Sequence, residues 1–63
     1  MKIILTENEK EALEKEHKTE RDGRVRDRLK AVLLSCEGWS QVDIAQALRI
    51  RPETVRDHLN DYQ

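Results

Sequence analysis

The chain contains few of the residues that hold small proteins together. Aromatic residues make up 3% of its 63 residues and phenylalanine is absent, so the core has to be built from leucine, isoleucine, valine and alanine. Cys36 is the only cysteine, which excludes an internal disulfide and indicates a reduced, intracellular protein or a piece of a larger one. No apolar run approaches the ~20 residues that a membrane-spanning helix needs, and no secretory signal opens the chain. We expect a single small domain over residues 1–63, with low stability because such a chain buries only ~60% of its unfolded surface.

Charged residues are frequent but nearly balanced in sign. They make up 40% of the chain, and 12 basic against 13 acidic residues give a formal net charge of −1. Proteins that bind nucleic acids usually carry a basic excess, which neutralises phosphates. The acidic excess lies in residues 1–20, with 4 basic and 6 acidic groups, whereas residues 21–63 hold 8 basic and 7 acidic groups. The second part of the chain can therefore present a positive face.

Two helices are predicted in the first part of the chain. Thr6 and Glu9 have the spacing of a capping box, which opens a helix from about residue 7 to residue 18. The next helix is capped either by Thr19 or by Asp22, and Gly38 ends it in a left-handed conformation. Its apolar stripe has a helical period and consists of Val25, Leu29, Val32, Leu33 and Cys36.

The short apolar lead at residues 2–5 has two open interpretations. It pairs as a strand with a second copy of the chain, or Ile3 and Leu5 cover the open end of the small core. A core of this size rarely supplies more than ~3–5 kcal/mol alone, which favours a homodimer.

Residues 39–59, WSQVDIAQALRIRPETVRDHL, have the spacing of a helix-turn-helix. Ser40 caps a helix that ends near residue 48 or 49, with Trp39 and Ile44 at the positions of a hydrophobic staple. Pro52 takes the first position of the last helix, where its missing N–H is not needed. The two apolar sets that face each other are Val42, Ile44, Ala45 and Leu48 in the first helix and Val55, His58 and Leu59 in the second.

The corner between these two helices depends on a few side chains. Ala45 is small enough for the helices to cross closely, Val55 fills the space from the second helix, and Ile50 plugs the turn. Many helix-turn-helix proteins have glycine where this chain has Arg49. Because a positive φ is strained for other residues, we expect a slightly wider turn here.

The stretch from Leu5 to the end resembles the N-terminal DNA-binding region of bacterial insertion-sequence transposases of the mariner-like superfamily. The matching features are Leu5-Thr6, an arginine-rich helix that ends in Leu33-Leu34 and Gly38, Trp39-Ser40, Ile44-Ala45, Leu48, Ile50, Thr54-Val55-Arg56 and His58-Leu59. The resemblance implies a homeodomain-like helical fold that binds double-stranded DNA at transposon ends. The acidic catalytic residues of those transposases lie in a downstream nuclease domain that this chain does not contain.

A second resemblance covers less of the chain. Residues 50–59, IRPETVRDHL, look like the recognition helix of two-component response regulators. In those domains one helix separates the Leu-Thr opening from the helix-turn-helix, whereas two are predicted here. The extra helix favours the transposase-type arrangement.

The last helix is predicted to read bases in the major groove of DNA. Arg56 can form a bidentate contact with guanine, Asn60 can pair with adenine, and Thr54 can reach a phosphate or a thymine methyl group. The alternative is an ordinary solvated helix face. The residues predicted to contact DNA are Arg24, Arg28, Ser40, Gln41, Arg51, Glu53, Thr54, Arg56 and Asn60.

Arginines of the second helix have two interpretations, which can share residues. Arg21, Arg24 and Arg28 grip phosphates as a row, or the arginines pair with the glutamates of the first helix. Cys36 falls on the apolar stripe and is expected to be a small buried filler, and His58 is a packing residue or a phosphate contact. We expect no catalytic residue, metal or cofactor, because neither a phosphate loop nor a Ser/His/Asp or metal-ligand spacing occurs.

These observations predict an all-α helix-turn-helix bundle of about four helices, with the helix-turn-helix proper at residues 40–61. We expect a cytoplasmic, nucleoid-associated protein that binds duplex DNA, as the N-terminal part of a transposase or as a small regulator, without enzymatic activity and without a membrane partner. The alternative is a helical protein-interaction module whose last helix docks a partner.

Overall fold

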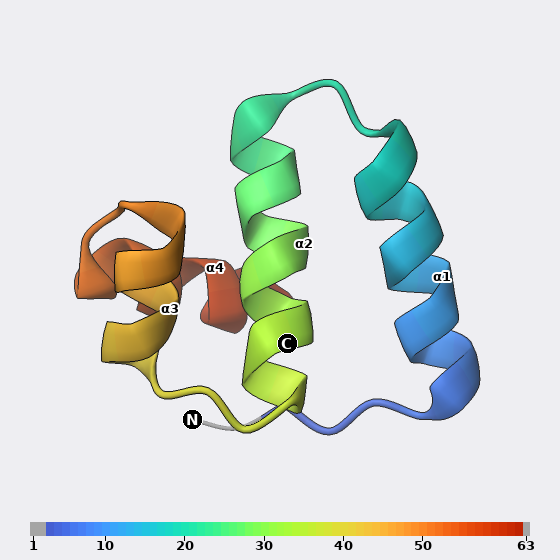
Figure 1. The fold of residues 1–63 in the computed structure, drawn as a ribbon, viewed down its shortest axis with the longest axis horizontal. Helices are drawn as coiled ribbons and strands as arrows, with labels where there is room; N and C mark the ends of the chain where they lie inside the picture. The colour runs from blue at the N-terminus through green and yellow to red at the C-terminus, as the bar shows by residue number, and fades with distance from the viewer. Residues whose placement is uncertain (1–2, 63) are drawn as a thin grey trace.

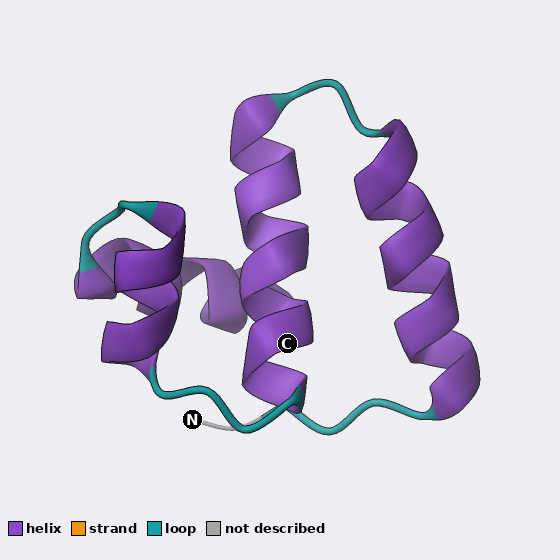
Figure 2. Ribbon diagram, viewed as in Figure 1, coloured by secondary structure: helices purple, strands orange, loops and turns teal. Residues whose placement is uncertain are grey.

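The computed structural model describes residues 3–62, which form four α-helices joined by short loops (Figures 1 and 2). None of these described residues lies in a β-strand, so the all-α prediction is confirmed. No helix among them is long and apolar enough to cross a bilayer. The helices are α1 (Glu7–Thr19), α2 (Gly23–Cys36), α3 (Gln41–Leu48) and α4 (Pro52–Tyr62).

The beginnings of α1 and α2 are set by side chains that accept backbone hydrogen bonds. Thr6 and Glu9 form the predicted capping box, in which each side chain accepts from the other residue's backbone N–H. Asp22 caps α2 and accepts from the N–H groups of Arg24 and Val25. Thr19, the alternative cap, is instead the last residue of α1. Its hydroxyl donates to carbonyl oxygens of the preceding turn.

Helix α2 is the centre of the fold. It packs against each of the other three described helices, while α3 and α4 also pack against each other. Figure 1 shows α1 and α2 running side by side, with α3 on the opposite side of α2 and α4 behind. The buried apolar side chains come from all four helices and from the N-terminal segment: Ile3, Leu13, Leu29, Ala31, Val32, Ile44, Ala45, Val55 and Leu59.

The buried surface of α2 differs from the predicted stripe. Leu29 and Val32 are buried as expected, but Cys36 is only half-buried, so the prediction of a buried filler there is wrong. Ala31 and Ser35 are buried instead. Because three helices and the N-terminal segment contact α2, its covered surface extends beyond one apolar stripe.

The N-terminal segment closes one end of the core. Ile3 is buried, and its backbone N–H donates to Ser35 Oγ at 3.3 Å. Leu5 packs against the core from its edge. The interpretation of this segment as a cover is thus confirmed for Ile3 and Leu5. Lys2 of the predicted strand lies outside the described residues, and residues 3–5 form no strand.

Candidate nucleic-acid interface

Helix α3 ends in a tight turn that directs the chain into α4. The N–H of Ile50 donates to Ala45 O at 3.0 Å, and the N–H of Arg49 donates to Gln46 O at 3.4 Å. This pair of hydrogen bonds is the Schellman pattern, which requires a left-handed residue after the helix. Arg49 supplies it with φ 58° and ψ 43°. The expected widening of the turn is therefore wrong, because the arginine itself adopts the left-handed conformation.

The corner between α3 and α4 is packed by the predicted side chains. Ile44, Ala45 and Val55 are buried, and Ile50 packs against them from the turn. Val42 does not belong to this core, because 54% of it is exposed. Its predicted place in the apolar set of α3 is wrong, since it lies only two residues before Ile44 and so points away from α4. Trp39, expected to staple onto Ile44, is 43% exposed.

The start of α3 is linked to the start of α4. Ser40 caps α3 and its Oγ accepts from the N–H of Asp43 at 3.1 Å. Gln41 is half-buried, and its Nε2 donates to Pro52 O at 3.4 Å. The predicted contact residues Ser40 and Gln41 therefore lie at the start of α3, and Gln41 helps to hold its junction with α4.

Helix α4 presents a polar face that has no partner among residues 3–62. Its inner face carries the buried residues Val55, His58 and Leu59. The exposed polar and charged residues outside this inner face are Arg51, directly before α4, and Glu53, Arg56, Asp57, Asn60 and Asp61 within it. Among the described residues, none of these six side chains forms a hydrogen bond or an ion pair. The side chains are thus available to an external ligand.

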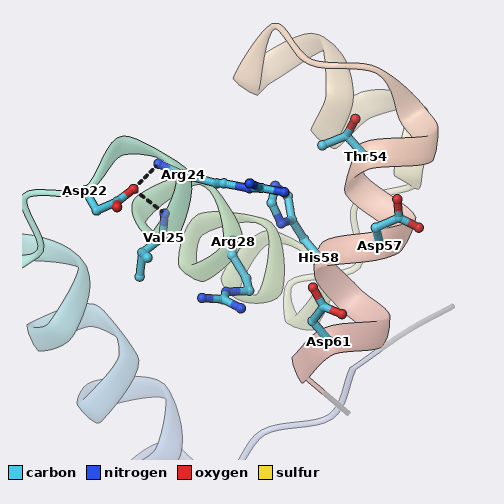
Figure 3. Close-up of a pocket in the computed structure, with 8 residues that line it drawn as sticks. All are labelled: Asp22, Arg24, Val25, Arg28, Thr54, Asp57, His58 and Asp61. Carbon is cyan, nitrogen blue, oxygen red and sulfur yellow. Dashed lines mark hydrogen bonds between the residues drawn. The ribbon is translucent and has the colours of Figure 1, made fainter.

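A groove separates the outer part of α4 from the first turns of α2. Figure 3 shows Arg24 and Arg28 on the α2 side and Thr54, Asp57 and Asp61 on the α4 side. Its volume is about 420 Å³. Thr54 is half-buried at this groove, so it lies nearer to α2 than the sequence predicted.

The arginines of this groove have no carboxylate of the described residues within ion-pair distance. Arg24 is exposed and Arg28 is half-buried. Within the described part of the chain, the ion pair that forms joins Lys10 Nζ and Glu37 Oε2 at 3.5 Å. The alternative in which the α2 arginines pair with the glutamates of α1 is therefore wrong for this structure, and both arginines are free to meet an anion.

Two further features of the site bear on its chemistry. His58 lines the groove but is only 7% exposed, which fits the packing role predicted for it. No group of three His, Cys, Asp or Glu side chains in residues 3–62 is arranged to hold a metal ion.

Asp57 is a residue of this groove that the sequence did not point to as a site residue. Its spacing of four residues from Glu53 was a signal that the two share one face of α4.

The four-helix bundle and the α3–α4 corner define a helix-turn-helix protein. Residues 22–63 match the family model of the homeodomain-like domain, and this match covers two thirds of the chain. The chain therefore belongs to the homeodomain-like family, and this membership suggests DNA binding in general. Comparison with curated proteins and with solved structures gave no significant match. Helix α1 lies outside the matched residues.

Proposed function

We propose that this chain binds double-stranded DNA sequence-specifically, with α4 in the major groove and α3 as the supporting helix. The observation that carries the proposal is the outer face of α4. It combines exposed polar side chains, which lack partners among the described residues, with an inner face that the core holds in place. A recognition helix needs both properties, because base contacts require free donors and acceptors at fixed positions.

Residues outside α4 support the proposal as contacts to the DNA backbone. Ser40 and Gln41 lie at the start of α3, and Arg51 is exposed directly before α4. Arg24 and Arg28 lie across the groove from α4, where they can meet phosphates beside the major groove. In this proposal, a single domain spans residues 1–63 and the helix-turn-helix proper spans residues 40–61.

We further propose that the chain is the N-terminal DNA-binding part of a transposase or a small stand-alone regulator. The motifs shared with mariner-like transposases support the first of these roles, from Leu5-Thr6 to His58-Leu59. A homodimer would add contact area to this small domain, and sedimentation of the chain with and without DNA would test it.

The alternative function is a protein-interaction module that docks a partner on α4. The near-neutral charge favours it, because residues 21–63 carry only one more basic than acidic group. Salt dependence separates the two functions. DNA binding should weaken steeply as salt rises, because phosphate contacts release counterions, whereas a protein interface on this mixed-charge face should depend on salt far less.

The proposed function predicts different effects for arginines of α4 and α2. Arg56→Ala should cost ~1–3 kcal/mol on a preferred site and flatten discrimination between sites, because Arg56 would contact a guanine edge. Arg24→Ala should weaken all duplexes alike and lower the salt slope by about one ion. Both variants would be titrated against preferred and scrambled duplexes at several salt concentrations.

Arg26→Ala provides a matched control for Arg24→Ala. Arg26 is exposed on the same helix but lies beside the end of α3, away from the groove. The Arg26→Ala substitution should leave the affinity for DNA close to that of the wild type. If Arg56→Ala left affinity and discrimination unchanged while the protein stayed folded, α4 would not be the reader and the protein-interaction function would be favoured.

A further inference from the structure

The order of side chains around α4 places carboxylates at the centre of its outer face. Successive residues of an α-helix are about 100° apart around the axis. Glu53 and Asp57 each lie two residues from the buried Val55, one before it and one after it, so each is about 160° away from it around the axis. Arg56 is about 100° from Val55 and therefore lies on the flank. The side of α4 opposite Val55 thus carries Glu53 and Asp57 together with Asn60, which is about 140° from Val55, and no basic residue, although the face as a whole is mixed in charge.

A carboxylate restricts which parts of DNA this face can contact. It has no proton to donate, so it needs a donor from the DNA. In the major groove the donors are the amino groups of cytosine and adenine, while guanine N7 and O6, thymine O4 and the phosphates are acceptors. A carboxylate at the centre of the reading face therefore disfavours most positions along a duplex.

We propose that Glu53 is a specificity-determining residue that accepts a hydrogen bond from the 4-amino group of a cytosine in the major groove. This inference rests on the proposed function of α4. Glu53 lies in the first turn of α4, the part of a recognition helix that reaches base edges. Its side chain is exposed and forms no hydrogen bond or ion pair with the described residues.

Asp57 is less suited to this contact than Glu53. It lies one turn farther along α4, its side chain is shorter, and it borders the groove that holds Arg24 and Arg28. Its carboxylate repels phosphate and so adds to the penalty on unspecific sites. The domain is nearly neutral in charge, and the two carboxylates further weaken its affinity for random DNA. They also create a preference for sites with cytosine at the Glu53 position.

A structural role for Glu53 makes a different prediction. A carboxylate in the first turn of a helix interacts favourably with the helix dipole. If that were its only role, Glu53→Gln would lower the melting temperature slightly and leave the base preference unchanged. If the preferred base changes when Glu53 is substituted, the preference cannot come from an interaction with the helix dipole.

The test is selection of binding sites from randomised duplexes by the full chain. The wild type should enrich cytosine at one position, and titration should show a preference for it of about tenfold over other bases. Glu53→Gln should lose that preference and shift it toward adenine, since glutamine can both donate to and accept from adenine. Its affinity for scrambled duplexes should rise, because one charge that repels phosphate is removed.

Two variants complete the design. Glu11→Gln removes the same charge at an exposed position of α1, outside the residues matched by the family, and should select the wild-type site. Glu53→Asp keeps the acceptor on a shorter side chain and should retain cytosine with a weaker preference. Circular dichroism would confirm that each variant is folded.

The outcomes separate this inference from the proposed function. If the wild type selects a site and Glu53→Gln selects the same site with the same affinities, the role of Glu53 is refuted while DNA reading by α4 stands. If the wild type selects no site and shows no salt-dependent binding to any duplex, the proposed function and this inference both fail.

Discussion

Backbone conformation at single residues decides how the helices end. Gly38 follows α2 with φ 97° and Arg49 follows α3 with φ 58°, and both turns close with the same pair of hydrogen bonds. Glycine adopts this region at no steric cost, whereas a residue with a Cβ is strained there by roughly 1–2 kcal/mol. The chain therefore carries local strain at the corner before α4 but none at the corner after α2.

The strain at Arg49 predicts that a glycine would stabilise the protein. Arg49→Gly should raise the free energy of unfolding by about 0.5–1 kcal/mol. This is the strain that is relieved in the folded state, reduced by the larger backbone entropy that glycine loses on folding. For a domain of this size the melting temperature would rise by roughly 2–8 °C. Thermal unfolding followed by circular dichroism at 222 nm measures it.

Gly38→Ala is the reciprocal control for this prediction. A Cβ at Gly38 would meet no atom within 4 Å, so its effect comes from the backbone conformation alone. The substitution should lower the melting temperature, because alanine rarely adopts φ 97°. An unchanged or lower melting temperature for Arg49→Gly would mean that Arg49 makes a stabilising contact that exceeds its strain.

Apart from α2, the helices are held in this fold by one face each. Helix α3 illustrates this, since Ile44 and Ala45 are buried against α4 while Val42 on the same helix is largely exposed. Val55 faces the α3 corner from α4 and is completely buried. Valine therefore occurs on both the inner and the outer surface of the helix-turn-helix, which permits a matched comparison.

Val55→Asp should unfold the protein, whereas Val42→Asp should not. The first substitution buries an unpaired charge between α3 and α4, which costs more than a domain of such limited stability can lose. The second places an acidic residue in the exposed first turn of α3 and should change stability by no more than ~0.5 kcal/mol. A normal helical spectrum and melting curve for Val55→Asp would contradict the packing of the corner.

At the scale of the whole molecule, α1 and the N-terminal segment complete the core of the homeodomain-like region. Leu13 of α1 and Ile3 belong to the same buried cluster as Leu29 and Val32 of α2. The family match begins at residue 22, after α1 has ended. The matched region thus lacks part of the apolar surface that covers α2 in this chain.

Residues 22–63 alone should therefore fold poorly. A three-helix fragment of this length is close to the ~40 residues below which chains usually need extra stabilisation, and it would expose Leu29. For this fragment we expect little cooperative unfolding in circular dichroism and rapid proteolysis. A fragment that melts at the temperature of the full chain would show that α1 is dispensable.

A single substitution in the full chain tests the same contact. Leu13→Ala should lower the free energy of unfolding by ~2–5 kcal/mol, whereas Glu14→Ala at the adjacent exposed residue should change it little.

Local chemistry made the helices of this protein predictable from its sequence. Capping side chains such as Thr6, Asp22 and Ser40 bind backbone N–H groups no more than three residues away. Proline favours the first position of a helix, and Pro52 begins α4. The helix-turn-helix spacing was predictable for the same reason, because its corner residues lie close together along the chain. The family match at residues 22–63 agrees with that spacing.

Only the tertiary structure decided which surfaces are covered and which remain free. Burial of Ala31 and Ser35, half-burial of Cys36 and exposure of Val42 depend on where distant helices lie, and no local pattern reports that. The glutamates of α1 and the arginines of α2 are opposite in charge, so the sequence allows ion pairs between them. The arrangement of the described helices does not bring them together. The position of Glu53 on α4 likewise acquires meaning only once the core has fixed the inner face. Burial is a property of the folded chain, since it arises from contacts between segments far apart in sequence.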